Sequence, residues 1–156
     1  MRWSLAFVTT VLAAGPVLAA PAKMSRHPRT GELGEISFPE QSARLSLDDN
    51  QKLGEIAGWA TENPAGLIVL DGHSAPNEPD GVRLSMLRAE AVRDRLVSLG
   101  IDSDRVVVAA FGTRGATATR RVVAWGTRED ADTVMSRLED RGATAVERGG
   151  VSRPAG

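Results

Sequence analysis

Hydrophobic residues in the middle of the chain follow two different periods. Residues 66–70 (GLIVL) form a short apolar run, which predicts a largely buried strand. From Leu84 onward the apolar positions recur in multiples of four, at Leu84, Val92 and Leu96, which predicts an amphipathic helix packed on a sheet. The polar segment 72–82 joins the strand to the helix. In α/β sheets this is the edge where ligands tend to bind.

Similar patterns predict the other elements. Trp59 lies off the apolar stripe of its helix, and we expect it to be partly exposed. We expect further strands at residues 35–38, 105–111 and 120–125, and an edge strand at 143–146. We expect one helix that follows a capping box at 46–49 and ends at Glu62, and another over residues 128–141.

The ends of the chain differ in composition from its centre. Residues 1–20 have a positive start, an apolar stretch and small residues at the end, as in a secretory signal peptide. We expect a polar linker over 21–34, a folded domain over 35–146 that includes the helix 128–141, and a disordered tail over 147–156. The protein is therefore expected in the periplasm, in contact with the cell wall or outer membrane.

Composition narrows the function. The 156 residues carry a net charge of −1, which gives no electrostatic reason to expect a nucleic-acid partner. The chain has no cysteine, which excludes disulfides, thiolate metal sites and a lipid-modified cysteine. Beyond the signal sequence we expect no transmembrane segment, because no other apolar run approaches the length needed.

One charged residue interrupts the apolar face of the central helix. Arg88 falls in the same row as Leu84, although a cation near the start of a helix opposes the helix dipole unless an anion is close. A half-buried guanidinium beside a loop is suited to bidentate binding of a carboxylate. The sequence leaves open a structural ion pair with Asp80, Glu78 or Asp71 instead.

These residues resemble a known family. Residues 84–96 (LSMLRAEAVRDRL) are similar to the LSxxRAxxVxxxL helix motif of the OmpA-like C-terminal domain family, and residues 72–75 (GHSA) resemble its GHTD strand end. Those domains are periplasmic modules that bind peptidoglycan non-covalently through the diaminopimelate of its stem peptide. The resemblance, over residues 35–125, implies an α+β fold: a two-layer α/β sandwich in βαβαββ order, with helices on one face of a mixed four-stranded sheet, to which this chain adds a C-terminal helix.

The resemblance also implies a binding site. Arg88 takes the place of the residue that grips a diaminopimelate carboxylate. Ala75 stands where the family has an aspartate that contacts the ligand's amino group, and Gly81 where it has an asparagine. Two functions stay open: binding of peptidoglycan, or the same fold with a degenerate site that serves as a protein–protein interaction module of the envelope. The ligand-binding residues implied are Arg88, His73, Ser74, Ala75, Leu84, Ser85 and Arg120.

Catalysis has little support in the sequence. Asp71 and His73 alternate onto one face of a strand end, next to Ser74. Ser74 is not on a nucleophile elbow, and no further histidine or carboxylate completes a triad. His27 has no second ligand at metal spacing. We therefore expect a binding protein without a metal or cofactor.

Overall fold

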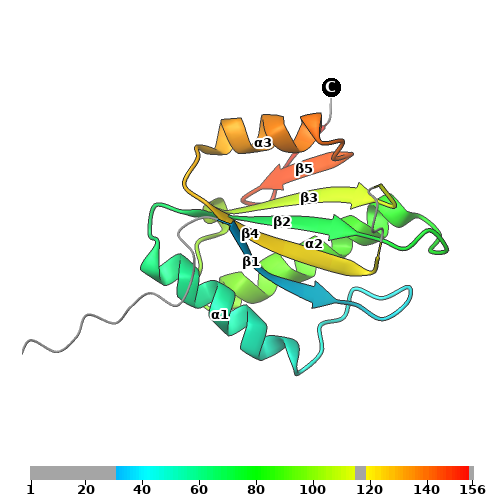
Figure 1. The fold of residues 1–156 in the computed structure, drawn as a ribbon, viewed down its shortest axis with the longest axis horizontal. Coiled ribbons are helices and arrows are strands. Elements are labelled where there is room, and N and C mark those ends of the chain that lie inside the picture. Colours follow the sequence, from blue (N-terminus) through cyan, green and yellow to red (C-terminus); the bar gives the residue numbers. More distant parts are fainter. Residues whose placement is uncertain (1–30, 115–118, 155–156) are drawn as a thin grey trace, which may run out of the picture.

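The computed structural model describes residues 31–114 and 119–154 of the chain, and within them six strands form one mixed sheet in the order β1-β4-β2-β3-β5-β6 (Figure 1). Strands β2 and β3 are parallel, and the other neighbouring pairs are antiparallel. The elements are β1 (Gly31–Ser37), α1 (Asp49–Glu62), β2 (Leu67–His73), α2 (Gly81–Ser98), a short 3-10 helix (Ser103–Arg105), β3 (Val106–Gly112), β4 (Arg121–Thr127), α3 (Ala131–Asp140), β5 (Ala145–Arg148) and β6 (Val151–Pro154).

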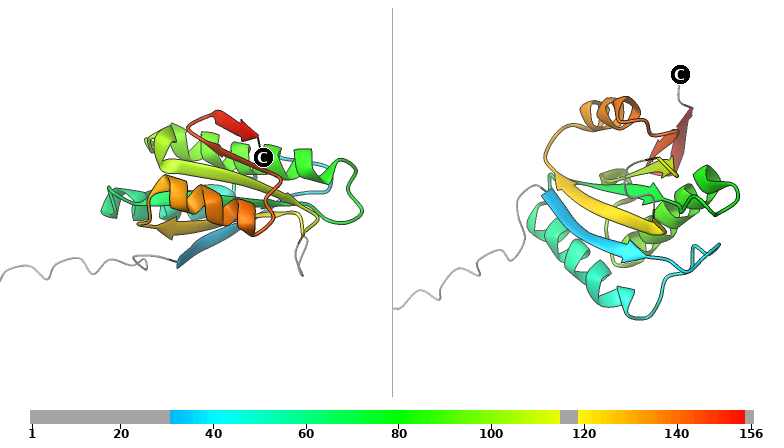
Figure 2. Two further views of the ribbon diagram at one scale, coloured as in Figure 1. Left: turned by 90° about the horizontal axis from the view of Figure 1, so that it is seen from above. Right: turned by 45° about the vertical axis from the view of Figure 1, so that its right-hand side comes forward.

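Helices cover both faces of the sheet. Helices α1 and α2 pack side by side on one face, and α3 lies on the other (Figures 1 and 2). Each face has its own apolar core. The first core includes Ile36, Leu53, Ile56, Trp59, Leu70, Val92, Leu96 and Val108, and the second includes Val69, Val107, Phe111, Val134, Met135, Leu138 and Val146.

The expected α+β architecture is confirmed, with three corrections. Strand β1 begins at Gly31, inside the expected linker, because residues 31–34 pair with Gly126, Trp125 and Ala124 of β4. Helix α3 lies on the face opposite α1 and α2, so it adds a third layer. The sheet has six strands: besides the four that the resemblance implies, β5 corresponds to the edge strand expected at 143–146, and β6 falls in the expected tail.

The two added strands form a β-hairpin. Between β5 and β6 lie Gly149 and Gly150, whose φ angles are +58° and +77°. Positive φ at both central residues is what a two-residue hairpin turn requires, and glycine adopts it without strain. The Gly-Gly pair was the signal in the sequence against a disordered tail. The signal peptide and residues 21–30 lie outside the described residues.

Side-chain hydrogen bonds mark the starts of two helices, before the N-cap residue of α1 and at the N-cap of α3. The expected capping box forms between Ser46, whose N and Oγ donate to Asp49 Oδ2 at 2.8 and 2.7 Å, and Asp49, whose N donates back to Ser46 Oγ at 3.3 Å. Helix α3 starts three residues later than expected because Asp130 caps it, accepting a hydrogen bond from Thr133 N at 2.9 Å. No helix within the described ranges is both long enough and apolar enough to cross a membrane.

The expectation for Trp59 was wrong, because its side chain is fully buried against the sheet. Two glycines leave the space that the indole ring occupies. A Cβ added at Gly126 would lie 2.5 Å from the indole, and one at Gly66 would lie 2.6 Å from it. The helical stripe alone does not reveal a space that two distant glycines create.

We predict that Gly126→Ala lowers the free energy of unfolding by about 1 to 3 kcal/mol, since the added methyl group overpacks the core. Urea denaturation measures the effect. Gly54→Ala in α1 is the control: its Cβ would meet no atom within 4 Å, and removing a helical glycine stabilises by roughly 0.5 to 1 kcal/mol. Equal stability of Gly126→Ala and the natural protein would contradict this packing.

Candidate functional site

Arg88 lies inside α2, and its side chain is fully buried. Three main-chain carbonyl groups accept from it: Nε donates to Ser42 at 2.8 Å, Nη1 to His73 at 3.1 Å and Nη2 to Pro39 at 3.1 Å. The remaining donors meet the Glu78 carboxylate in a bidentate pair, at 2.8 Å from Nη1 and 2.6 Å from Nη2. All five N–H groups of the guanidinium are therefore satisfied within the protein.

Glu78 is held as firmly as its partner. Besides the two hydrogen bonds from Arg88, its carboxylate accepts from the main-chain N–H groups of Ala75 at 2.9 Å and Gln41 at 2.8 Å. Hydrogen bonding by Arg88 is the largest influence on this carboxyl, and it outweighs burial to lower the pKa of Glu78 to about 2. The pair therefore stays ionised well into the acid range.

Three separate segments build this site. The segment after β1 contributes carbonyl groups and Phe38, whose ring lies 5.6 Å from the Arg88 guanidinium carbon. The loop between β2 and α2 contributes Glu78, which a turn brings back so that its N–H donates to Ala75 O at 3.0 Å. Helix α2 contributes the arginine. Asp80, with a φ of +53°, connects the loop to the helix.

The sequence left three acidic partners open for Arg88, and the structure selects Glu78. Asp80 is exposed, 4.0 Å from Arg83. Asp71 lies on the other face of the sheet, where its Oδ2 accepts from Arg141 at 3.0 Å. Chain spacing does not distinguish these carboxylates, because the choice depends on how the loop folds.

Ser85 and Leu84 have different environments. Ser85 is fully buried; its Oγ donates to Val82 O at 2.8 Å and accepts from Gly112 N at 3.0 Å, which fixes α2 against β3. Leu84 is partly exposed and lines a surface depression of about 300 Å³ beside the site. The other residues that line the depression are Gln41, Pro79, Asp80, Arg83 and Leu87, and Arg88 is not one of them.

The remaining predicted site residues surround the ion pair without contributing side chains to it. His73 and Ala75 take part through main-chain groups only. The His73 ring stacks on Phe111 of the neighbouring strand β3, and the two ring centroids are 5.3 Å apart. Ser74 is buried beside Gly81, where a Cβ would come within 2.5 Å of its hydroxyl. Arg120 is half-exposed at the rim, 3.9 Å from Glu40.

The helix motif, the buried arginine and the order of elements point to one family, and the sequence matches it. The family model described as "OmpA family" covers residues 37–132, more than half of the chain. The chain belongs to the OmpA family. The match ends at residue 132, so most of α3 and the β5–β6 hairpin lie beyond it. No curated protein is significantly similar to the chain.

Solved structures of OmpA-family domains share the fold. The peptidoglycan-associated lipoprotein of Burkholderia pseudomallei is 20% identical, with a TM-score of 0.52 over 60% of this chain and 89% of that one. The OmpA-like domain of FopA1 from Francisella tularensis subsp. tularensis is 19% identical, with a TM-score of 0.53 over 74% and 90%. The C-terminal domain of Helicobacter pylori MotB is 17% identical, with a TM-score of 0.56 over 69% and 93%.

We predict that the ion pair makes stability depend on pH. The folded-state pKa of Glu78 is lowered from 4.5 to about 2, so its contribution, roughly 3 kcal/mol, is present above pH 4.5 and is lost as the pH falls through 2. Urea unfolding from pH 7 to 2 should show Glu78→Gln far less stable than the natural protein at pH 7, with the gap closing toward pH 2. A gap that is constant with pH would contradict an ionised pair.

Proposed function

We propose that this OmpA-family protein is a non-catalytic module of the cell envelope that associates with peptidoglycan, and that a carboxylate of the diaminopimelate stem peptide binds at Arg88. One observation carries the proposal. The site around Arg88 already receives a carboxylate, that of Glu78, through two guanidinium and two main-chain donors. Such a bidentate, charge-assisted arrangement would suit a ligand carboxylate equally well.

Glu78 is then a competitor for the ligand. A stem-peptide carboxylate reaches Arg88 only after Glu78 moves out, and the depression next to the loop is the side from which it would enter. The apparent affinity falls by the fraction of molecules in which the loop is open. We therefore propose a closed site in the free protein, with binding weaker than the same site would show without Glu78.

A second function is favoured by the same contacts. Because both side chains of the ion pair are fully buried and every Arg88 donor is used, the site is complete without a ligand. Ala75 also offers no carboxylate to a ligand amino group. In this alternative Glu78 never leaves, and the domain serves as a protein–protein interaction module in the envelope. In both proposals the predicted signal peptide delivers the protein to the periplasm.

Cosedimentation with purified sacculi separates these functions. We expect Glu78→Gln to bind at least about tenfold more tightly than the natural protein, because the neutral amide competes less well for Arg88. Free diaminopimelate should release it. Adding Arg88→Gln to this variant should abolish the gain, whereas adding Arg95→Gln, an arginine in the last turn of the same helix, should leave it unchanged.

Circular dichroism would establish that each variant is folded. If folded Glu78→Gln does not sediment more than the natural protein, or if the gain survives Arg88→Gln, diaminopimelate binding at Arg88 is wrong. If neither Glu78→Gln nor the natural protein sediments with sacculi, the interaction module is favoured.

We also predict that Ala75→Asp, made in the Glu78→Gln protein, raises affinity for sacculi by a further factor of about ten. The new carboxylate would pair with the ligand's ammonium group, worth about 1 to 3 kcal/mol. Ala75→Asn is the matched control, since it has nearly the same shape without the charge. Equal binding by the aspartate and asparagine variants would show that the ammonium group does not lie near residue 75.

A further inference from the structure

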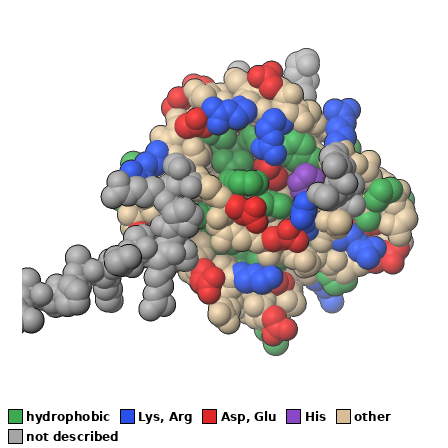
Figure 3. All heavy atoms as spheres, viewed as in Figure 1, with side chains coloured by type: hydrophobic (Ala, Val, Ile, Leu, Met, Phe, Trp, Pro, Cys, Tyr) green, Lys and Arg blue, Asp and Glu red, His purple; other side chains and the backbone are tan. Residues whose placement is uncertain are grey.

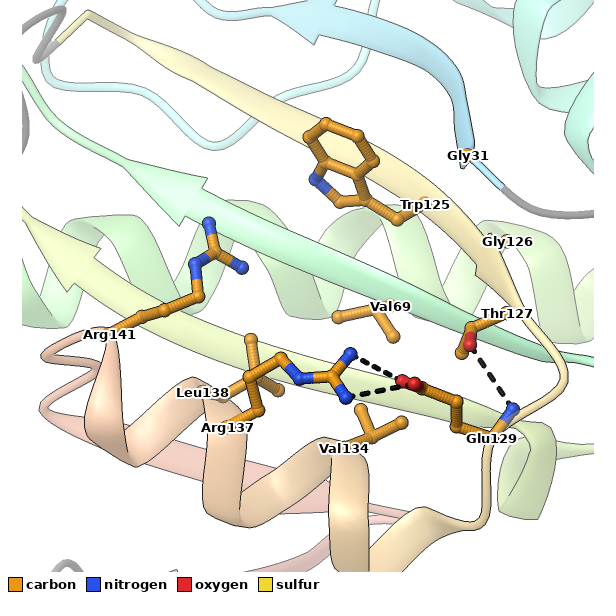
Figure 4. Close-up of a pocket in the computed structure, with 10 residues that line it drawn as sticks. All are labelled: Gly31, Val69, Trp125, Gly126, Thr127, Glu129, Val134, Arg137, Leu138 and Arg141. Atoms are coloured by element: carbon orange, nitrogen blue, oxygen red, sulfur yellow. Dashed lines mark hydrogen bonds and ion pairs between the residues drawn. The ribbon is translucent and has the colours of Figure 1, made fainter.

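A second candidate site lies on the opposite face of the sheet from Arg88. There, a cavity of about 360 Å³ separates α3 from β2 and β4 (Figure 4). Its size falls within the range of about 300 to 1,000 Å³ typical of small-molecule sites. The residues that line it are Gly31, Val69, Trp125, Gly126, Thr127, Glu129, Val134, Arg137, Leu138 and Arg141.

The inner surface of this cavity is apolar. Val69 of β2 lies between Trp125 of β4 and the side chains of Val134 and Leu138 on α3 (Figure 4). The space-filling view shows hydrophobic side chains gathered in a hollow, with charged side chains around them (Figure 3). The cavity therefore offers a hydrophobic part of a ligand a place out of water.

Arg141 supplies a polar group that is already oriented. Its Nη2 donates to Asp71 Oδ2 at 3.0 Å, and Asp71 is only 1% exposed. The arginine side chain is 48% exposed, and its guanidinium carbon lies 5.1 Å from the Phe111 ring centre. Nη1 makes no hydrogen bond with any described residue, so it is available to an acceptor in the cavity.

Two further polar atoms near Arg141 are incompletely paired. Asp71 Oδ1 and Trp125 Nε1 are buried, and neither completes a hydrogen bond within the described residues. The indole is close enough to the Asp71 carboxyl to lower its pKa slightly, although burial dominates and raises that pKa. The two atoms face each other, since a hydrogen bond from the indole is one of the influences that lower the pKa of Asp71, and the weak geometry of this contact leaves both incompletely paired.

Among the charged residues that line the cavity, Arg141 has a donor left for an anion. On one wall Glu129 and Arg137 form a bidentate pair and neutralise each other. At the other end lies Arg141, and Arg114 is close by, since its Nη1 donates to Gly142 O at 3.3 Å. The carboxylates on this face include Asp71, which pairs with Arg141, and Glu32, which lies opposite Trp125 on β1.

We propose that this cavity binds a small amphiphilic carboxylate, with its apolar part between Trp125 and Leu138 and its carboxylate on Nη1 of Arg141. Helix α3, which forms one wall, lies almost entirely beyond the segment matched to the OmpA family. The site is therefore a feature of this chain's C-terminal addition and is independent of Arg88.

NMR titration of the ¹⁵N-labelled protein tests the proposal, with the indole N–H signals of Trp125 and Trp59 as reporters for the two faces. The probes are octanoate, for an aliphatic acid, and N-acetyl-leucyl-leucine, for a peptide C-terminus. Each has its primary amide as a control. We expect saturable shifts of the Trp125 signal with the acids, little change at Trp59, and at least about tenfold weaker binding of the amides.

Variants localise the carboxylate. Asp71→Asn combined with Arg141→Gln removes the arginine without leaving a buried charge unpaired, and it should weaken octanoate binding about tenfold. Arg83→Gln removes an arginine from the far face and should bind as the natural protein does. If either acid binds more tightly than its amide, the proposal is supported. The acid that binds more tightly of the two shows whether the cavity prefers an aliphatic acid or a peptide C-terminus.

Equal affinity for octanoate and octanamide would overturn the proposal, as would the absence of saturable shifts at Trp125. The comparison of acid with amide needs no substitution, so it stands even if the double variant fails to fold. Unchanged octanoate binding in a folded double variant would also refute the role of Arg141.

Discussion

A buried arginine holds the first half of this domain together. Burying a guanidinium is costly unless it is paired and hydrogen-bonded, and Arg88 meets that condition only when three segments converge on it. Glu78 comes from the loop after β2, and the carbonyl groups of Pro39 and Ser42 come from the segment after β1. The loop conformation beside α2 thus depends on this one ion pair.

The same interaction connects structure to function. The Arg88 site contains its own carboxylate and is complete without a ligand, so under the proposed function an external acid would have to replace the two hydrogen bonds that Glu78 accepts from Arg88. Glu78 therefore has two properties under the proposed function: it stabilises the fold at neutral pH, and it would compete with a ligand for Arg88. Membership of the OmpA family therefore does not by itself decide the strength of binding.

The two faces of the sheet are covered by different helices. Helices α1 and α2, which lie within the family match, cover the face that contains Arg88. Helix α3 covers the other face, over β3 and β5. Beside this helix lies the cavity lined by Trp125 and Arg141. Since the sheet separates them, the two sites can change independently.

Local pattern determined much of this protein. The apolar periods placed β2 and α2, the Ser46–Asp49 capping box placed α1, and the helix motif identified the family, because each depends on residues close together in the chain. Tertiary structure alone decided that Glu78 rather than Asp71 or Asp80 pairs with Arg88, that Trp59 is buried beneath Gly126, and that α3 crosses to the opposite face. The physical reason is that these outcomes depend on contacts between segments far apart in the chain, and residue spacing does not encode which of several chemically equivalent partners the folded backbone brings within reach.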